Sequence, residues 1–308
     1  MKEIYRNKLL SHKLIMVSGK GGTGKTLVAA SLAKLASEQG KRVLLAESCD
    51  STQLSPLVGQ NLASHQQTQI SSHLFAINLN SRECFREYVE DHLGLKQLYR
   101  RVFNHRIMKS FVEAIPGLNE IMILGKICNS LRPDSDGHCF DMVILDAPAS
   151  GHFYGLVSTP DAIVSSGLTG PLMNEINKIR QYLANPELCT SLLVAIPEAL
   201  VINETLEFLE KLQQSKFISV GGVLLNRSYL SDENRFPQAI ADIPDQFSAA
   251  KQYLQSKFDS FQDQHFILQN KLNSLEDGPG MACLPEFGVI PEPLNSAFQH
   301  RLWEHCKH

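Results

Sequence analysis

The sequence lacks both the cysteine spacing of a zinc site and the even cysteine count of a disulfide scaffold. Its seven cysteines include no pair at C-x-x-C spacing, and their number is odd. A zinc knuckle and a disulfide framework are therefore not expected. Most of these cysteines should be small buried side chains in a reducing compartment.

Long apolar segments and clusters of positive charge are also absent from the sequence. No hydrophobic run approaches the roughly 18 residues that a membrane-spanning helix needs. The formal net charge is only −3, and there is no basic block like those that bind nucleic acid or anionic membranes. We therefore expect a cytoplasmic protein with no nucleic-acid partner.

Repeats and low-complexity linkers are absent as well, although the chain has 308 residues. Hydrophobic residues make up 43% of the sequence and charged residues 20%, as is ordinary for a globular protein with a sizeable core. These features predict a single domain over residues 1–308, with embellishments rather than a second independent unit.

A strand, a loop, a helix and a second strand follow one another near the start of the chain. Leu14 to Ser18 is a short apolar run that predicts a buried strand. Apolar residues at helical spacing predict a helix from Lys25 to Gln39, and Gly40 is well placed to end it. Arg42 to Glu47 predicts the next strand. This order is a βαβ unit, which implies a parallel sheet.

Later segments extend the α/β pattern. A long helical pattern at about 81–135 predicts a helical subdomain, with further helices at about 165–185 and 235–275. The predicted fold class is α/β, a doubly wound and mostly parallel sheet with this helical subdomain inserted. Short apolar runs predict the remaining strands at residues 74–79, 140–145, 191–196 and 220–225.

Residues 19–26, Gly-Lys-Gly-Gly-Thr-Gly-Lys-Thr, match the phosphate-loop pattern G-x-x-x-x-G-K-[ST] between a predicted strand and a predicted helix. Glycines let the backbone turn sharply and direct its N–H groups at phosphates, and the helix N-terminus adds its positive dipole end. Lys25 should place a positive charge near the β- and γ-phosphates. The loop therefore predicts ATP and ADP binding. The expected nucleotide contacts are Gly21, Gly22, Thr23, Gly24, Lys25, Thr26 and Leu27.

A second element, which carries an acidic residue, is expected to hold the metal ion of such a site. Phe140 to Ala147 contains an apolar strand that ends in Asp146, where a Walker-B carboxylate would lie at the carboxyl edge of a parallel sheet. The Thr26 hydroxyl and the Asp146 carboxylate are therefore the predicted ligands of Mg²⁺. An aspartate in this position could instead cap the following helix, an interpretation that the phosphate loop disfavours.

The phosphate loop contains an additional lysine, Lys20, in an order that resembles the deviant loop of the arsenical-pump and tail-anchored-protein-targeting ATPases. In that class, which includes relatives in septum placement, chromosome partition and nitrogenase reduction, the extra lysine reaches across a dimer interface to the partner's nucleotide. The resemblance therefore implies an ATPase that forms an ATP-dependent homodimer, with Lys20 and Lys25 as catalytic residues. The chain has a single such loop, so the dimer would consist of two chains.

Other stretches place the resemblance in the arsenical-pump branch and extend it over about residues 13–305. The heptapeptide from Asp146 to His152 is similar to the second switch of that branch, although its proline lies one position earlier here. Val223 to Arg227 resembles a strand that ends in an adenine-contacting asparagine. Leu284-Pro285-Glu286 resembles a late loop that covers the base. The resemblance thus implies adenine contacts at Asn226, Arg227 and Pro285.

The first switch departs from this family. The family motif is D-P-A-H, whose aspartate orients the attacking water, and alignment from the preceding Val-Leu-Leu places Cys49 at that position. A thiol is a poor hydrogen-bond partner for water. Asp50 has suitable chemistry one residue later, so we predict that Asp50 is the catalytic residue that positions the water. The alternative is that neither residue does so.

The leading hypothesis is a homodimeric, Mg²⁺-dependent ATPase that couples ATP binding and hydrolysis to movement of its helical subdomain. The sequence does not identify its client protein or membrane partner. Apolar residues of the helical region would form either a client groove or, as we favour, ordinary core. These residues are Met108, Phe111, Ile121, Met122 and Leu124.

Two alternative functions stay open at this point. The altered first switch would suit a nucleotide-gated binding protein with little or no hydrolysis. A partition- or septum-type ATPase is the other alternative, although the chain ends without an extended basic amphipathic helix for membranes. A metalloid-pump role is not supported, because the stretch just after His152 lacks the cysteine that arsenite-binding members carry.

Overall fold

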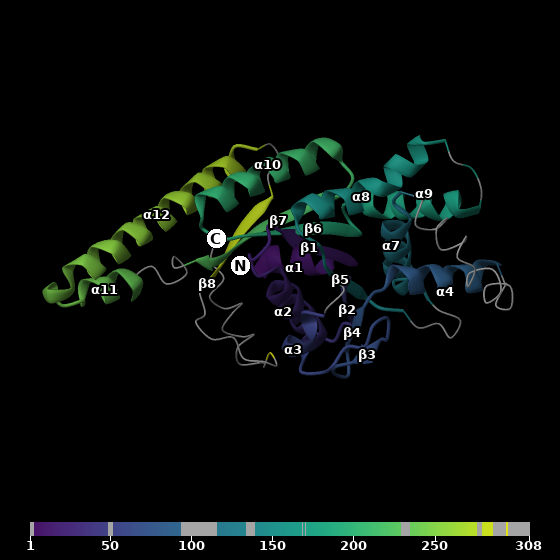
Figure 1. Ribbon diagram of the computed structural model, residues 1–308, viewed down its shortest axis with the longest axis horizontal. Coiled ribbons are helices and arrows are strands. Elements are labelled where there is room, and N and C mark those ends of the chain that lie inside the picture. The colour runs from purple at the N-terminus through teal and green to yellow at the C-terminus, as the bar shows by residue number, and fades with distance from the viewer. Residues whose placement is uncertain are drawn as a thin grey trace.

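The protein builds one eight-stranded sheet with helices on both of its faces (Figure 1). The computed structural model describes residues 3–48, 52–93, 116–133, 139–167, 169, 171–228, 235–275, 279–285 and 294. Neighbouring strands run parallel except for β3 and β4, which are antiparallel. In spatial order the strands are β3 (Thr68–Gln69), β4 (Leu74–Asn78), β2 (Val43–Glu47), β5 (Met142–Asp146), β1 (Leu14–Gly19), β6 (Cys189–Ala195), β7 (Ser219–Ser228) and β8 (Gly280–Pro285).

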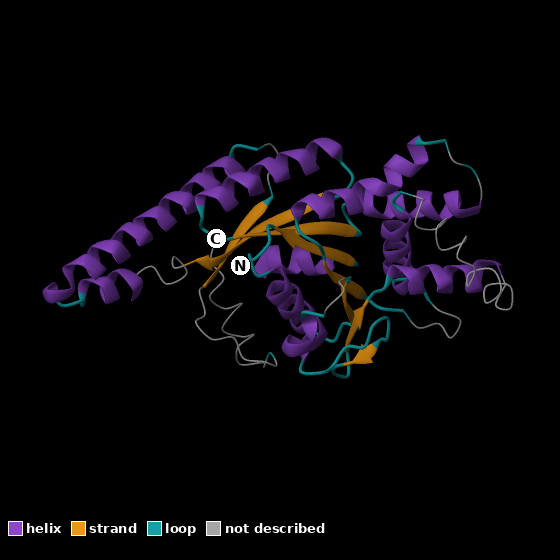
Figure 2. Ribbon diagram, viewed as in Figure 1, coloured by secondary structure: helices purple, strands orange, loops and turns teal. Residues whose placement is uncertain are grey.

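Alternate residues of the central strand β1 point into two separate cores. Leu14 and Met16 belong to the core on the side of α7 (Leu118–Ser130), α8 (Ser150–Ser165), α9 (Pro171–Ala184), α10 (Ala199–Ser215) and α12 (Ser248–Asn273). Ile15 and Val17 belong to the core on the side of α1 (Glu3–Ser11), α2 (Lys25–Glu38) and α3 (Leu54–Val58). Figure 2 shows the strands between these two helical layers. Because both faces are covered, the central strands are continuous apolar runs and do not alternate with polar residues.

The α/β fold class and the six predicted strands are confirmed, each strand within a few residues of its expected ends. The predicted helix after the phosphate loop is α2, and Gly40, which was expected to end it, has a left-handed φ of +87°. The elements that were not predicted include α1, α3, α8, the two-residue strand β3 and the edge strand β8. Leu284 and Pro285 were expected in a loop, but they lie in β8, which pairs with β7.

Two groups of helices lie toward opposite ends of the sheet (Figure 1). The first group, called the helix cluster below, consists of α4 (Ser81–Leu93), α7, α8 and α9, which pack on one another. The second consists of α11 (Arg235–Ala241), a short 3₁₀ helix (Asp245–Phe247) and α12, which packs against α10 and β8. The sequence prediction joined residues 235–275 to the same subdomain as 81–135. In the structure α12 adds Leu268 and Leu272 to the same core as the helix cluster but packs on α10 and β8 toward the other end of the sheet, so the grouping stays a prediction.

Buried side chains of the helix cluster answer one of the questions left open by the sequence. Ile121, Met122 and Leu124 of α7 are all buried in the core, as the ordinary-core interpretation predicts. Met108 and Phe111 lie outside the described residues. The described cysteines are free thiols, and Cys84, Cys128, Cys189 and Cys283 are buried. Across the described ranges, no helix has both the length and the apolar character needed to cross a membrane.

Candidate nucleotide-binding site

The phosphate loop joins β1 to α2 at the carboxyl edge of the sheet, as predicted, and two of its glycines are required by close contacts. Gly19 has a φ of +147°, and a Cβ added there would lie 2.2 Å from the carbonyl oxygen of Val194 in β6. Gly24 precedes α2 with a φ of +91°, and a Cβ there would lie 2.4 Å from Nδ2 of Asn226. Any other residue would therefore move the loop away from the adjoining strands.

Hydrogen bonds within the loop hold its shape. The Thr23 hydroxyl donates to the Lys20 carbonyl at 2.9 Å, and the Lys25 ammonium donates to the same carbonyl at 3.0 Å. The Asn226 amide, at the end of the β7 core, donates to the Thr23 carbonyl at 2.9 Å. Lys25 therefore lies across the loop, and contacts from the loop itself and from β7 fix the backbone that would receive phosphates.

Burial shifts the ionisation of the two oppositely charged groups at the centre of the site. Desolvation lowers the pKa of Lys25, and the nearby Asp146 carboxylate opposes this effect. Desolvation raises the pKa of Asp146 to about 6; the Thr26 hydroxyl and Lys25 oppose this, whereas the charge of Glu47 adds to it. Burial thus disfavours the ionised form of both groups relative to water. This is typical of a site that receives a charged ligand.

Two carboxylates stand side by side where β2 and β5 end. Glu47 and Asp146 are paired in the parallel register of these strands. Glu47 is only 1% exposed, and its Oε2 accepts the backbone N–H groups of Gln53 at 3.1 Å and Leu54 at 3.3 Å. Oε1 of Glu47 and Oδ1 of Asp146 are buried without a hydrogen-bond partner among the described residues. A carboxylate oxygen of this kind needs a cation or a donor.

These residues fit a magnesium ion. Mg²⁺ prefers oxygen ligands, uses one or two carboxylates and completes its coordination with water and substrate phosphates. The Thr26 hydroxyl, the unpartnered Asp146 oxygen and the adjoining phosphate loop supply this donor set. Thr26 Oγ1 also donates to Oε1 of Gln53 at 3.3 Å, which connects it to the segment that follows β2.

Sequence reasoning missed Glu47 and Gln53. The reasoning that selected Asp146, a polar residue at the carboxyl end of a buried strand, applies equally to Glu47. Gln53 has no comparable signal, because its position depends on the path of the loop between β2 and α3. Cys49 and Asp50 of the first switch lie outside the described residues.

The additional lysine of the loop is held by its own chain. Lys20 Nζ lies 2.8 Å from Oε1 of Glu204 on α10, and the two side chains are 31% and 42% exposed. Lys20 therefore lies near the surface, where it forms an ion pair that solvent screens. Gly21 and Gly22 are also exposed, and a Cβ at either position would meet nothing within 4 Å. Leu27, the last predicted contact, is half-buried.

The predicted adenine contacts lie where β7 and β8 end. Asn226 is buried, and its side-chain amide donates to the Thr23 carbonyl, so in this structure it stabilises the phosphate loop. Arg227 is exposed with a left-handed φ of +55°, at an irregularity in the pairing of β7 with β8. Pro285 ends β8 opposite Ser228. Contacts of these three residues with a base stay a prediction.

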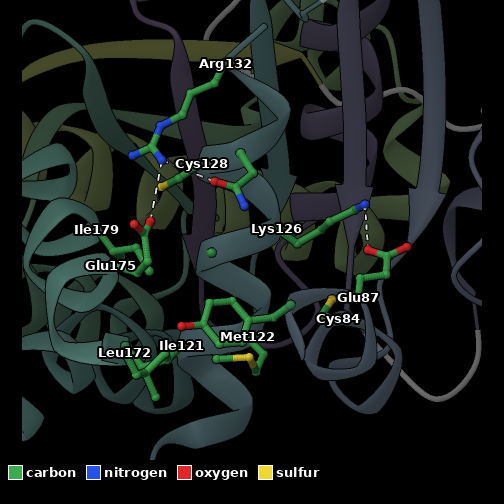
Figure 3. A pocket seen from close by; sticks show the side chains of 13 residues that line it. Cys84, Glu87, Ile121, Met122, Lys126, Cys128, Arg132, Leu172, Glu175 and Ile179 are labelled. Carbon is green, nitrogen blue, oxygen red and sulfur yellow. Dashed lines mark hydrogen bonds and ion pairs between the residues drawn. The ribbon is translucent and has the colours of Figure 1, made fainter. Parts of the chain in front are cut away.

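A second hollow lies away from the phosphate loop, between α4, α7 and α9 of the helix cluster (Figure 3). It encloses about 110 Å³ and has mixed apolar and charged walls. Lys126 Nζ lies 2.7 Å from Oε2 of Glu87, and Arg132 Nη1 lies 3.6 Å from Oε2 of Glu175. Its charged side chains are thus already paired with one another. Among its described lining residues, the basic side chains Lys126 and Arg132 are each beside a carboxylate and not available to bind phosphate.

Comparisons with known proteins agree with this site. Residues 12–169 and 169–277 match the family model described as anion-transporting ATPase. The chain is 27% identical over 229 residues to ATPase BagA of Mycobacterium tuberculosis, covering 72% of this chain and 67% of that protein. It is 25% identical over 290 residues to ATPase get3 of Schizosaccharomyces japonicus, covering 83% and 86%.

It is also 24% identical over 342 residues to ATPase asna-1 of Caenorhabditis elegans, covering 95% of this chain and 96% of that protein. The resemblance inferred from the loop of residues 19–26 is therefore confirmed. Since the family model spans most of the chain and the phosphate loop has the geometry of a nucleotide site, the protein belongs to the anion-transporting ATPase family and is an ATPase.

Proposed function

We propose that this ATPase is Mg²⁺-dependent, acts as a homodimer, and uses ATP binding and hydrolysis to move its helix cluster against a client protein or membrane partner. The observation that carries the proposal is the unpartnered, buried oxygen of Asp146 beside Thr26 and Lys25. A cation bound together with a polyanion would satisfy these groups.

The residues of the loop have separate tasks in this proposal. The backbone N–H groups after Gly21 and the N-terminus of α2 receive the phosphates, because both present partial positive charge. Lys25 exchanges its bond to the Lys20 carbonyl for the β- and γ-phosphates. Thr26 and Asp146 hold the magnesium ion, which neutralises charge on the phosphates when bound. A cation here favours the ionised form of Asp146, against the effect of burial.

Lys20 supports the homodimer part of the proposal. It stands near the surface, and among the described residues it forms an ion pair with the half-exposed Glu204. An exposed pair of this kind contributes about 0–1 kcal/mol to stability, so Lys20 can leave it at little cost. The resemblance to the deviant-loop ATPases implies that Lys20 then contacts the nucleotide of the partner chain.

The second switch connects the site to the helix cluster. Asp146 ends β5, and after only three residues the chain enters α8 at Ser150. The Ser18 hydroxyl donates to the Pro148 carbonyl at 2.9 Å, and the Ala147 N–H donates to Val17, so this connection is tied to the base of the phosphate loop. Because α8 packs on α7 and α9, a displacement at Asp146 would reach the whole cluster.

Two contacts anchor Gln53, which follows the first switch in the sequence, beside the phosphate loop. Glu47 holds the backbone at Gln53, and the Gln53 side chain accepts from Thr26. Asp50 lies three residues before Gln53 in the sequence. We propose that Asp50 positions the attacking water, because a carboxylate can accept its hydrogen bond.

Single-turnover hydrolysis by the full chain tests the proposal. Asp50→Asn should abolish turnover while leaving the affinity for ATP and Mg²⁺ unchanged, and Cys49→Ala should leave both unchanged. Unchanged turnover in Asp50→Asn would remove Asp50 from the mechanism. If the wild type hydrolyses no faster than Lys25→Ala, the protein is instead a nucleotide-gated binder.

A further inference from the structure

Glu47 stands out among the acidic residues because its surroundings do not account for its charge. It is 1% exposed, and it forms no ion pair within the described part of the chain. One of its two oxygens accepts two backbone N–H groups, and the other has no hydrogen-bond partner there. Burying an ionised carboxylate in this way is unfavourable unless a further group binds it.

The face of the sheet on which the Glu47 side chain lies follows from the strand pairing. Glu47 and Asp146 occupy paired positions on adjacent parallel strands, so their side chains leave the same face of the sheet. The two carboxylates influence one another electrostatically, as do Asp146 and Lys25. The unpartnered oxygens of both therefore belong to one buried polar region beside Thr26.

We propose that Glu47 is a second carboxylate of the magnesium site, with Oε1 accepting hydrogen bonds from water bound to the ion while Oε2 anchors the start of α3. The inference rests on the proposed function, because it requires Mg²⁺ and nucleotide at the phosphate loop. Glu47 is a positioning residue in this scheme. It connects the ion to the segment that carries Asp50.

Capping of α3 alone does not explain this residue. A neutral side chain such as glutamine or asparagine would accept the N–H groups of Gln53 and Leu54 without burying a charge. A glutamate next to Asp146 instead brings two like charges together, which stabilises the protein only when a cation lies between or beside them. Magnesium retains most of its water and binds carboxylates both directly and through that water, so a second acidic oxygen suits it.

Glu47→Gln is the sharpest test, because it keeps the size of the side chain and an oxygen for the two N–H groups. Calorimetry with a non-hydrolysable ATP analogue at a series of Mg²⁺ concentrations measures the effect. We expect unchanged affinity for the analogue without Mg²⁺. The Mg²⁺ concentration that gives half of the affinity gain should rise about tenfold, as is typical when a residue that supports metal ligands is lost.

Asp141→Asn is the matched control. Asp141 begins the same β5 segment at the opposite edge of the sheet, and its carboxylate accepts the Arg42 N–H at 2.8 Å. This variant should give the wild-type Mg²⁺ curve. If Glu47→Gln also gave that curve while remaining folded, Glu47 would be a helix cap only and the inference would be overturned. A wild type with no Mg²⁺ dependence at all would instead refute the proposed function.

A measurement on the wild type keeps the inference testable even if Glu47→Gln fails to fold. Hydrogen exchange reports on the Gln53 and Leu54 amides, which donate to Glu47. Mg²⁺ added to the analogue complex should slow their exchange severalfold, because the ion would fix the accepting carboxylate. Equal exchange with and without Mg²⁺, in a complex whose analogue binding does depend on Mg²⁺, would contradict the proposed connection.

Discussion

At the phosphate loop, buried oxygens of Asp146 and Glu47 have no partner in the described structure, whereas Glu87 and Glu175 in the helix cluster each lie beside two basic side chains. Glu87 is shared by His65 and Lys126, and Glu175 by Arg132 and Lys178. A region that satisfies its own charges needs no ligand for stability, but one that leaves them buried and unpaired does. The unpaired carboxylates at the phosphate loop are typical of a ligand site, whereas the paired carboxylates of the helix cluster are typical of a region that is satisfied by its own side chains.

The two lysines of these regions give the largest expected contrast. Lys25→Ala should weaken binding of ATP with Mg²⁺ by a hundredfold or more, roughly, because it removes a charge-assisted contact from a partly dehydrated site. Lys126→Ala should leave that affinity unchanged, because Lys126 pairs with Glu87 away from the loop. Isothermal calorimetry of both variants makes the comparison. Unchanged affinity in Lys25→Ala would contradict the assignment of the loop.

Lys20 should separate binding from turnover. We expect Lys20→Ala to bind nucleotide almost normally. Its turnover rate should fall roughly a thousandfold, as when an arginine finger is removed from a phosphoryl-transfer site. Glu204→Gln removes the partner of Lys20 in the same chain and should leave turnover close to that of the wild type. Sedimentation with an ATP analogue should show a compact dimer for the wild type. A monomer in every nucleotide state, with normal turnover in Lys20→Ala, would refute the dimer.

Asp146 should make the nucleotide-free protein sensitive to pH. Its pKa is raised to about 6 in the folded chain, so its contribution to stability is complete below about pH 4 and is lost as pH rises through about 6. Asp146→Asn should therefore be more stable than the wild type by up to about 3 kcal/mol above pH 7, and equal to it near pH 4. Urea unfolding with a chelator present measures the difference. If the difference in the free energy of unfolding between Asp146→Asn and the wild type did not change with pH, the raised pKa of Asp146 would be contradicted.

Two glycines give the smallest of these contrasts. Gly24→Ala should destabilise the fold by about 1–3 kcal/mol, because its left-handed φ of +91° and the nearby Asn226 amide both oppose a methyl group. Gly125 lies inside α7, where the nearest atom to a new Cβ would be Ile179 Cδ1 at 3.7 Å. Gly125→Ala should therefore stabilise the protein by about 0.5–1 kcal/mol. Thermal unfolding decides both signs, and a stabilised Gly24→Ala would refute the strain ascribed to the loop.

The phosphate half of the site was predictable because its chemistry is local. Residues 19–26 are contiguous, and the glycines, Lys25 and Thr26 are each demanded by the same ligand. Asp146 could be added because a buried strand indicates its own carboxyl end. The continuous apolar runs gave the central strands for the same reason, since burial on both faces leaves a clear pattern.

Features that depend on contacts between segments far apart in the chain could not be predicted from the sequence. The contact from Asn226 to Thr23 joins residues far apart in the sequence, and it directs this amide to the loop. Gln53 reaches Thr26 only through the folded path after β2. The placement of α12 toward the end of the sheet away from the helix cluster depends on its packing against α10 and β8, which amphipathicity alone does not specify. Edge strand β8 is short and mixed in composition, so its pattern is weak.

The central position of β1 has a consequence for the newly synthesised chain. Leu14 pairs with Val143 on one side and with Cys189 on the other, so β1 acquires its first neighbour only after more than a third of the chain has been made. Pairings of such long sequence separation form late and slowly. The phosphate loop is thus translated among the first residues but becomes rigid among the last. The loop is completed by β6 and by Asn226 of β7, so an N-terminal fragment that ends before these strands lacks part of the site that binds ATP.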